Sequence, residues 1–166
     1  PGDFSLSVHG QRYDANGVPQ GSEFTVNTHT TGQQLSPSIT AMADGGFVAT
    51  WTSIGQDGSG DGVFGQRFDA NGNHVGGEFQ VNTNTLSTQR ESSVAGLAGG
   101  GFVAMWESFT VDNGTFNFAI MGQRYDANGV AIGGEFQVNQ PNTASQNNVV
   151  VTALADGGFV AAWQSY

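Results

Sequence analysis

The stretch Gly122-Gln123-Arg124-Tyr125-Asp126-Ala127-Asn128-Gly129 (GQRYDANG) decides the fold, because the chain carries it three times. Earlier copies run from Gly10 to Gly17 (GQRYDANG) and from Gly65 to Gly72 (GQRFDANG), so successive copies begin 55 and 57 residues apart. A fixed period of this length is typical of repeat architectures, in which each unit is one supersecondary structure. The fold must therefore be built from a repeated unit.

Two further phrases keep the same spacing and give the unit its limits. One is a Phe-Val-Ala phrase that ends in Trp, and the other is a Glu-Phe phrase that ends in Val-Asn; they begin at Phe47, Phe102 and Phe159, and at Glu23, Glu78 and Glu135. The sequence thus predicts a single repeat domain over residues 1–166, with units at about 10–64, 65–121 and 122–166.

Each unit reads as four short antiparallel strands joined in two hairpins. Apolar and polar residues alternate through the phrases, and Gly-rich turns separate them, as at Asn16-Gly17 and Asp44-Gly45-Gly46. Asn-Gly is a strong signal for a two-residue type I′ hairpin turn. No segment has helical periodicity. The predicted fold is all-β and β-propeller-like, with a β-trefoil or a β-prism as alternatives.

The charges suggest one ion pair per unit. Each repeated Glu follows a repeated Arg by 11 residues, and a two-residue turn would place the two side chains diagonally on one face of the hairpin. The predicted pairs are Arg12 with Glu23, Arg67 with Glu78 and Arg124 with Glu135.

Composition argues against several classes of partner. The net charge is −10, with four Arg and no Lys, so the chain cannot neutralise a run of nucleic-acid phosphates and anionic membranes repel it. No apolar run is long enough to span a membrane. The absence of Cys excludes disulfides and Cys-ligated zinc.

The best metal candidate is the stretch from Asp57 to Gly62. Asp57, Ser59 and Asp61 place oxygen ligands at positions 1, 3 and 5, and a Gly follows at position 6, as at the opening of an EF-type calcium loop. Position 12 is Phe68, where such a loop has a carboxylate. The alternative interpretation is a solvated Gly/Asp turn. We predict a Ca²⁺ site at Asp57, Ser59 and Asp61.

No catalytic constellation stands out, so the sequence predicts no catalytic residues and leaves the ligand-binding residues unspecified. No Gly-x-Ser-x-Gly elbow occurs, and the three His lie at unrelated positions of their units. Trp51, Trp106 and Trp163 fall at equivalent positions inside apolar strands, which favours core layers over sugar-stacking platforms.

The phrases GGFVATW, DGSGDGVFGQRFDANG and GGEFQVNT resemble a tandem repeat of large secreted bacterial hemolysin-type calcium-binding (RTX-like) proteins. The resemblance covers nearly the whole chain. It implies propeller blades used in adhesion, an extracellular location, type I secretion and calcium in the medium. The nonapeptide calcium repeats of those proteins are absent from this sequence.

These observations predict an extracellular, non-enzymatic module that binds a glycan or a protein, adhesin- or lectin-like. The alternative is the scaffold of a polysaccharide-degrading enzyme. An enzyme should gather charged residues that differ between units, whereas a repetitive binder should present equivalent ones.

The ends of the chain predict partners for its edge strands. Pro1 in place of Met predicts a processed product or a fragment, and the repeat phrases predict half a blade at each end. Unpaired strand edges invite association. We expect either a homodimer that completes a six-bladed ring or further blades of the same polypeptide.

Overall fold

The computed structural model describes residues 5–112, 115–140 and 144–166, and among them every regular element is a β-strand. The strands are β1 (His9–Tyr13), β2 (Pro19–Thr25), β3 (Gln34–Ala41), β4 (Phe47–Ile54), β5 (Asp61–Phe68), β6 (His74–Gln80), β7 (Gln89–Gly96), β8 (Phe102–Asp112), β9 (Thr115–Tyr125), β10 (Ala131–Gln137), β11 (Gln146–Ala153) and β12 (Phe159–Ser165).

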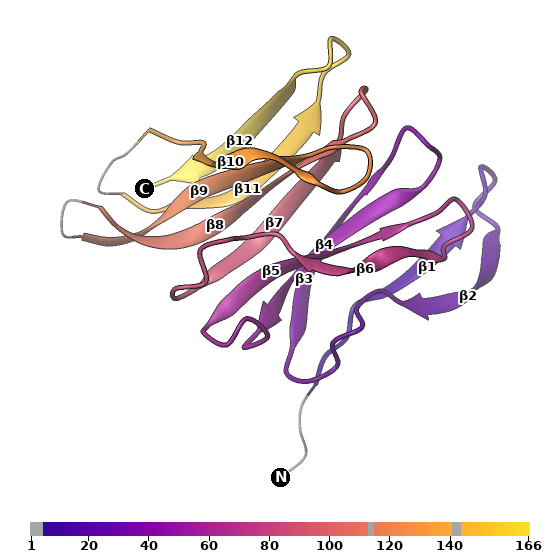
Figure 1. The fold of residues 1–166 in the computed structure, drawn as a ribbon, viewed down its shortest axis with the longest axis horizontal. Coiled ribbons are helices and arrows are strands. Elements are labelled where there is room, and N and C mark those ends of the chain that lie inside the picture. Colours follow the sequence, from indigo (N-terminus) through magenta and orange to yellow (C-terminus); the bar gives the residue numbers. More distant parts are fainter. Residues whose placement is uncertain (1–4, 113–114, 141–143) are drawn as a thin grey trace.

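The strands form four antiparallel sheets in series, which confirms the propeller-like fold. Strands β3 to β6 make the first blade and β7 to β10 the second, each in sequence order. The N-terminal half-blade is β1–β2 and the C-terminal half-blade is β11–β12. Figure 1 shows the sheets face to face, with a half-blade at each end of the array. Each blade therefore takes two strands from one repeat and two from the next.

The hydrophobic core lies between sheets rather than within any one of them. One cluster joins the N-terminal half-blade to the first blade around Trp51, a second joins the two blades around Trp106, and a third joins the second blade to the C-terminal half-blade around Ile120. The prediction of core layers is confirmed for Trp51 and Trp106, which are fully buried, but not for Trp163 of the C-terminal half-blade, which is 36% exposed. Each blade needs its neighbour, because one sheet cannot bury its own apolar faces.

The repeated Asp-Ala-Asn-Gly turn is longer than the predicted two-residue loop. Asp14 N donates to Val18 O at 2.9 Å, and only Gly17 has a positive φ, of 79°. The Asp14 carboxylate accepts hydrogen bonds from the amides of Asn16 and Val18. This is a three-residue hairpin loop with Gly in the left-handed region, not a type I′ turn. The Asp side chain stabilises it, which the dipeptide signal did not show.

We call the four strands of a blade A to D in chain order, so the C–D hairpins are β1–β2, β5–β6 and β9–β10. A bulge follows in the returning strand of each C–D hairpin, and the repeated Gln fills it. In the first blade, Gln66 is fully buried, and its Nε2 donates to the carbonyl of Arg67 at 2.8 Å and lies within 3.4 Å of those of Val75 and Gly76. Gln11 and Gln123 make the same contacts in their hairpins. The bulge leaves carbonyl oxygens outside the ladder, and the amide satisfies them.

The longer turn and the bulge together shift the register, and the predicted ion pairs are wrong. Arg67 lies opposite Val75, and the ladder is interrupted before Phe79. Arg67 Nη2 instead donates to Ala127 O at 2.6 Å, in the C–D turn of the next blade. Arg12 Nη1 reaches Asn71 O in the same way.

The repeated Glu reaches the opposite way, to the preceding blade. Glu78 Oε2 accepts hydrogen bonds from Thr28 N at 2.7 Å and from the Thr28 hydroxyl at 2.9 Å, and Glu135 accepts one from Thr83 N. Burial acts to raise the pKa of Glu78, but the hydrogen bonds from Gln56 and Thr28 outweigh it and the pKa is lowered. Arg and Glu thus connect blades to each other.

Candidate functional site

The charged residues that differ between units gather at one end of the array. We call it the loop end: it carries the connections between blades at 27–33 and 82–88 and the turn at 55–60, and the tight Asn-Gly and Gly-Gly turns lie at the other end (Figure 1). The turn at 55–60 of the first blade packs against the connection into the second blade, where Gly60 lies against the Ser87 carbonyl. The candidate site lies at this junction.

Asp57 contributes a buried carboxylate oxygen to which none of the described residues donates a hydrogen bond. Its Oδ1 accepts a hydrogen bond from Ser59 N at 3.0 Å, which shapes the turn. Its Oδ2 is buried and has no hydrogen-bond partner among the residues that the structure describes. Gly62 packs against it, since a Cβ at Gly62 would lie 2.9 Å from Oδ2. A buried carboxylate oxygen is costly without a donor, so this oxygen suits a ligand, a proton or a cation.

Asp61 lies beside Asp57 at the start of β5. Burial raises the pKa of the Asp61 carboxyl; Arg90 opposes that rise and the negative charge of Asp57 adds to it. Two neighbouring carboxylates do not ionise independently, because the first negative charge disfavours the second. The raised pKa of Asp61 favours its protonated form, the form in which a carboxyl acts as a general acid.

Arg90 is the cation of the site, and Glu107 holds it. Arg90 Nε donates to Glu107 Oε2 at 3.2 Å, and the Arg90 guanidinium lies 4.4 Å from the centre of the Phe118 ring. Glu107 is buried, and its Oε1 accepts a hydrogen bond from Asn148 N at 2.7 Å. Both Glu107 oxygens are engaged, so Glu107 positions Arg90, which is half-exposed and interacts electrostatically with Asp61.

The sequence reasoning missed Arg90 and Glu107, although a signal was present. Glu107 occupies the repeat position that Thr52 and Gln164 hold in the other units, and Arg90 the position of Leu35 and Asn147. A position-by-position comparison of the units identifies Arg90 and Glu107, because each is charged where the other two units have an uncharged residue.

Of the predicted calcium ligands, the structure brings two together. Asp57 and Asp61 interact electrostatically, whereas Ser59 is exposed at the tip of the turn. Residues Asp61–Phe68 form β5, and Phe68 is buried in the core. Within the described part of the chain, no group of three or more carboxylate or imidazole side chains is placed to hold a metal. Calcium binding at Asp57, Ser59 and Asp61 stays a prediction.

Fold and site define an array of β-propeller blades with a carboxylate pair at one junction. The solved structures that are similar to it include an endo-arabinase from Bacteroides thetaiotaomicron VPI-5482, at a TM-score of 0.52 and 15% identity, and an alpha-L-arabinofuranosidase from Lactobacillus brevis, at a TM-score of 0.52 and 10% identity. The first match covers 82% of this chain and 52% of the other, and the second 93% and 59%. At these identities the likeness shows the fold, and the chain spans little more than half of either enzyme.

No protein-family model and no curated protein matches the chain. In the described residues, no helix is long and apolar enough to cross a membrane.

The comparisons correct our expectation about function. We expected a non-enzymatic adhesin- or lectin-like module, but both similar structures are of carbohydrate-active enzymes. The charged residues at the loop end also differ between units, which is the pattern that we expected of an enzyme. The findings therefore favour the alternative, the scaffold of a polysaccharide-degrading enzyme.

Proposed function

We propose that this chain is the scaffold of a polysaccharide-degrading enzyme and that its loop end hydrolyses glycosidic bonds. The observation that carries the proposal is the Asp57–Asp61 pair beside Arg90, since a pair of carboxyl groups is the usual equipment for glycoside hydrolysis. The names of the two similar structures support a glycan as the substrate class and make arabinan the first substrate to test.

The two carboxyl groups divide the chemistry between them. Asp61 acts as the acid, in keeping with the direction of its pKa shift, and gives a proton to the glycosidic oxygen as the bond from that oxygen to the sugar breaks. Water supplies the oxygen of the new bond to the sugar, and Asp57 accepts the proton that this water loses. Arg90 binds substrate hydroxyls beside them, and Glu107 fixes its position.

The test is release of reducing sugar from soluble arabinan, with xylan and mixed-linkage β-glucan in parallel. Asp57→Asn and Asp61→Asn should each lower the rate by at least about a hundredfold, the usual share of one acid–base group. Glu23→Gln is the matched control, because Glu23 is an exposed carboxylate outside the site. Unchanged rates in both Asp variants, or no release by the wild-type chain, overturn the proposal.

Calcium binding to the same carboxylates is tested separately, by calorimetry. If Asp57, Ser59 and Asp61 bind Ca²⁺, calorimetry with CaCl₂ should give a binding isotherm that Asp61→Asn abolishes, and Ser59→Ala should weaken it. An isotherm unaffected by both substitutions, or none at all, removes the calcium site. Neither result depends on hydrolysis.

The remaining expectations concern setting and assembly. The repeat phrases support an extracellular bacterial protein of the RTX-like kind, exported by type I secretion. The unpaired edges of β1 and β12 support completion of a ring by a second copy, in which β12 of one chain pairs with β1 of the other. Further blades of the same polypeptide are the alternative occupant of these edges.

Burial within the repeats supports this pairing. Trp163 is 36% exposed, whereas Trp51 and Trp106, its equivalents in the two blades, are 0% and 1% exposed. Tyr13 is 61% exposed, whereas its equivalent Tyr125 is 4% exposed. Pairing β12 with β1 supplies the sheet that these side chains lack.

A further inference from the structure

The hairpin β8–β9 is longer than its counterpart in the first blade and carries aromatic residues on its extension. Strands β8 and β9 have 11 residues each, whereas β4 and β5 have eight each. The ladder continues through the pairs Phe109 with Phe118 and Val111 with Phe116. The extension replaces the Gly/Asp turn of the first blade with paired strand and projects from the loop end.

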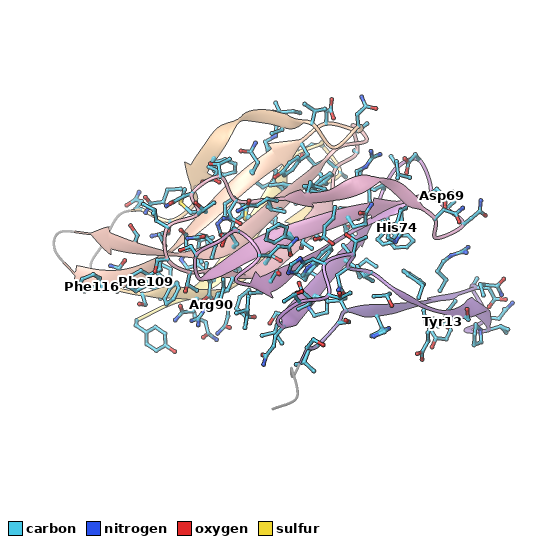
Figure 2. The ribbon with its side chains drawn as sticks, turned by 60° about the horizontal axis from the view of Figure 1, so that its bottom comes forward. Tyr13, Asp69, His74, Arg90, Phe109 and Phe116 are labelled. Carbon is cyan, nitrogen blue, oxygen red and sulfur yellow. The ribbon has the colours of Figure 1, made fainter. Side chains whose placement is uncertain are left out.

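Three phenylalanine rings form a row along this extension. The rings of Phe109 and Phe116 are stacked, with centroids 5.8 Å apart and an interplanar angle of 15°, and the Phe118 ring meets Phe109 edge to face at 5.5 Å. Phe116 is nevertheless 71% exposed. Figure 2 shows Phe109 and Phe116 together near the tip of the hairpin, with Arg90 closer to the body of the molecule.

The row leads directly to the charged site. The Arg90 guanidinium lies over the Phe118 ring, and Arg90 interacts electrostatically with Asp61. An apolar surface thus continues into a cation and a carboxyl pair. A sugar chain has matching surfaces, because the C–H face of a sugar ring stacks on an aromatic ring while its hydroxyls bind charged groups.

A protein partner fits this surface less well. Full burial of one aromatic side chain removes about 150–250 Å² from water, whereas a stable protein interface needs about 800 Å² on each partner. Among the described residues of the loop end, Leu86, Tyr166 and Leu6 are also exposed, but they lie on other segments: the connection into the second blade, the residue after β12 and the residues before β1. Within the row of three phenylalanines, only Phe116 is strongly exposed, and one ring is the size that a single sugar residue covers.

We propose that Phe116, backed by Phe109, is a sugar-stacking platform that holds the polysaccharide chain beside the Asp57–Asp61 pair. This rests on the proposed function and adds a binding subsite to it. Phe109 fixes the plane of Phe116, and Arg90 binds hydroxyls of the next sugar toward the carboxyl pair.

The experiment separates stacking from general hydrophobic contact. Binding of soluble arabinan is measured by affinity electrophoresis in an Asp61→Asn background, so that the polysaccharide stays intact. Phe116→Leu keeps apolar bulk but loses the flat ring, and should weaken binding about three- to tenfold, the range expected for one aromatic contact. Phe116→Trp should bind at least as well as the parent. Leu86→Ala is the matched control and should not change binding.

The outcomes distinguish this inference from the proposed function. If Phe116→Leu binds as tightly as its parent while the wild-type chain still hydrolyses arabinan, the platform is overturned and the proposed function stands. If Phe116→Leu weakens binding but hydrolysis survives Asp57→Asn and Asp61→Asn, the platform stands and the carboxyl pair is overturned. If the chain binds none of the three polysaccharides, both are overturned.

Discussion

At the scale of the residue, the phrase that begins Gly-Gln-Arg is repeated because its residues make the same packing contacts in each copy. The first Gly of the phrase lies under the Phe of the Glu-Phe phrase in every copy: a Cβ at Gly65 would come within 2.8 Å of the Phe79 ring, and at Gly122 within 2.9 Å of the Phe136 ring. The two repeated residues are therefore one packing unit, because the ring occupies the place of a side chain.

This contact makes Gly65→Ala destabilising. The methyl group would meet the Phe79 ring and the Ala49 carbonyl, and we expect the free energy of unfolding to fall by about 1–3 kcal/mol, the usual cost of overpacking. Urea denaturation followed by circular dichroism measures it. Gly77→Ala is the control, because a Cβ there meets nothing within 4 Å. Equal effects of the two substitutions would contradict this packing.

Asp61 predicts a pH dependence of stability. Its folded pKa lies above the ordinary value of 3.8, chiefly because of burial, so the unfolded chain ionises first. The free energy of unfolding should therefore fall as pH rises from about 3.8 through the raised pKa. Asp61→Asn cannot ionise and should gain stability relative to wild type across that window. Denaturation at pH 3 and pH 7 checks this, and a difference between the proteins that does not vary with pH would contradict it.

At the scale of the element, side chains hold neighbouring blades in place. Arg67 is largely buried against the turn of the second blade, and its Cδ lies 2.9 Å from the position that a Cβ of Gly129 would take. Arg124 occupies the equivalent position but is exposed, since the C-terminal half-blade has no C–D turn. The same residue type therefore has different roles in two units.

We expect Arg67→Ala to destabilise the chain by about 1–3 kcal/mol, because the Ala127 carbonyl loses a charged donor and the methylene packing is lost. Arg124→Ala should change stability by less than about 0.5 kcal/mol. Thermal unfolding of both variants at low protein concentration measures the difference. A larger effect for Arg124→Ala would show that the inter-blade contact does not stabilise the fold.

At the scale of the whole molecule, the proposed completion of the ring concerns the unpaired edges of the two half-blades. In both blades the second Gly of the Gly-Gly turn packs against a carbonyl of the C strand: Gly46 against Phe68 O and Gly101 against Tyr125 O. Gly158 is the equivalent residue of the C-terminal half-blade, and the nearest atom to a Cβ there is the Asp156 carboxylate at 3.1 Å. In a completed blade, Gly158 would meet Tyr13 of another copy.

Gly158→Ala therefore tests ring completion. The methyl group is tolerated in the single chain but would clash with the C strand of a second copy. Light scattering after size exclusion should give a dimer for the wild-type chain and a monomer for Gly158→Ala, with unchanged circular dichroism. Gly134→Ala, where a Cβ meets no atom within 4 Å, should remain dimeric. A monomeric wild-type chain contradicts completion by a second copy.

The sequence by itself determined the repeat, the four strands per unit, the propeller-like class and the half-blade at each end. These follow from local patterns, because alternation and turn residues act over a few positions and recur in each copy. The two-residue turn predicted from Asn-Gly was wrong, because Asn-Gly is compatible with both two-residue and three-residue hairpin loops. The hydrogen bonds that the Asp14 carboxylate accepts stabilise the three-residue loop. That error shifted the register and placed the repeated Arg and Glu in one ion pair.

Only the tertiary structure decided which residues of different units meet. Arg67 and Glu78 are 11 residues apart, yet each binds a different neighbouring blade. Asp61, Arg90 and Glu107 belong to three different strands, and only the packing of the first blade against the second brings them to one junction. Such contacts depend on how sheets face each other, a property of the assembled array that no single repeat encodes.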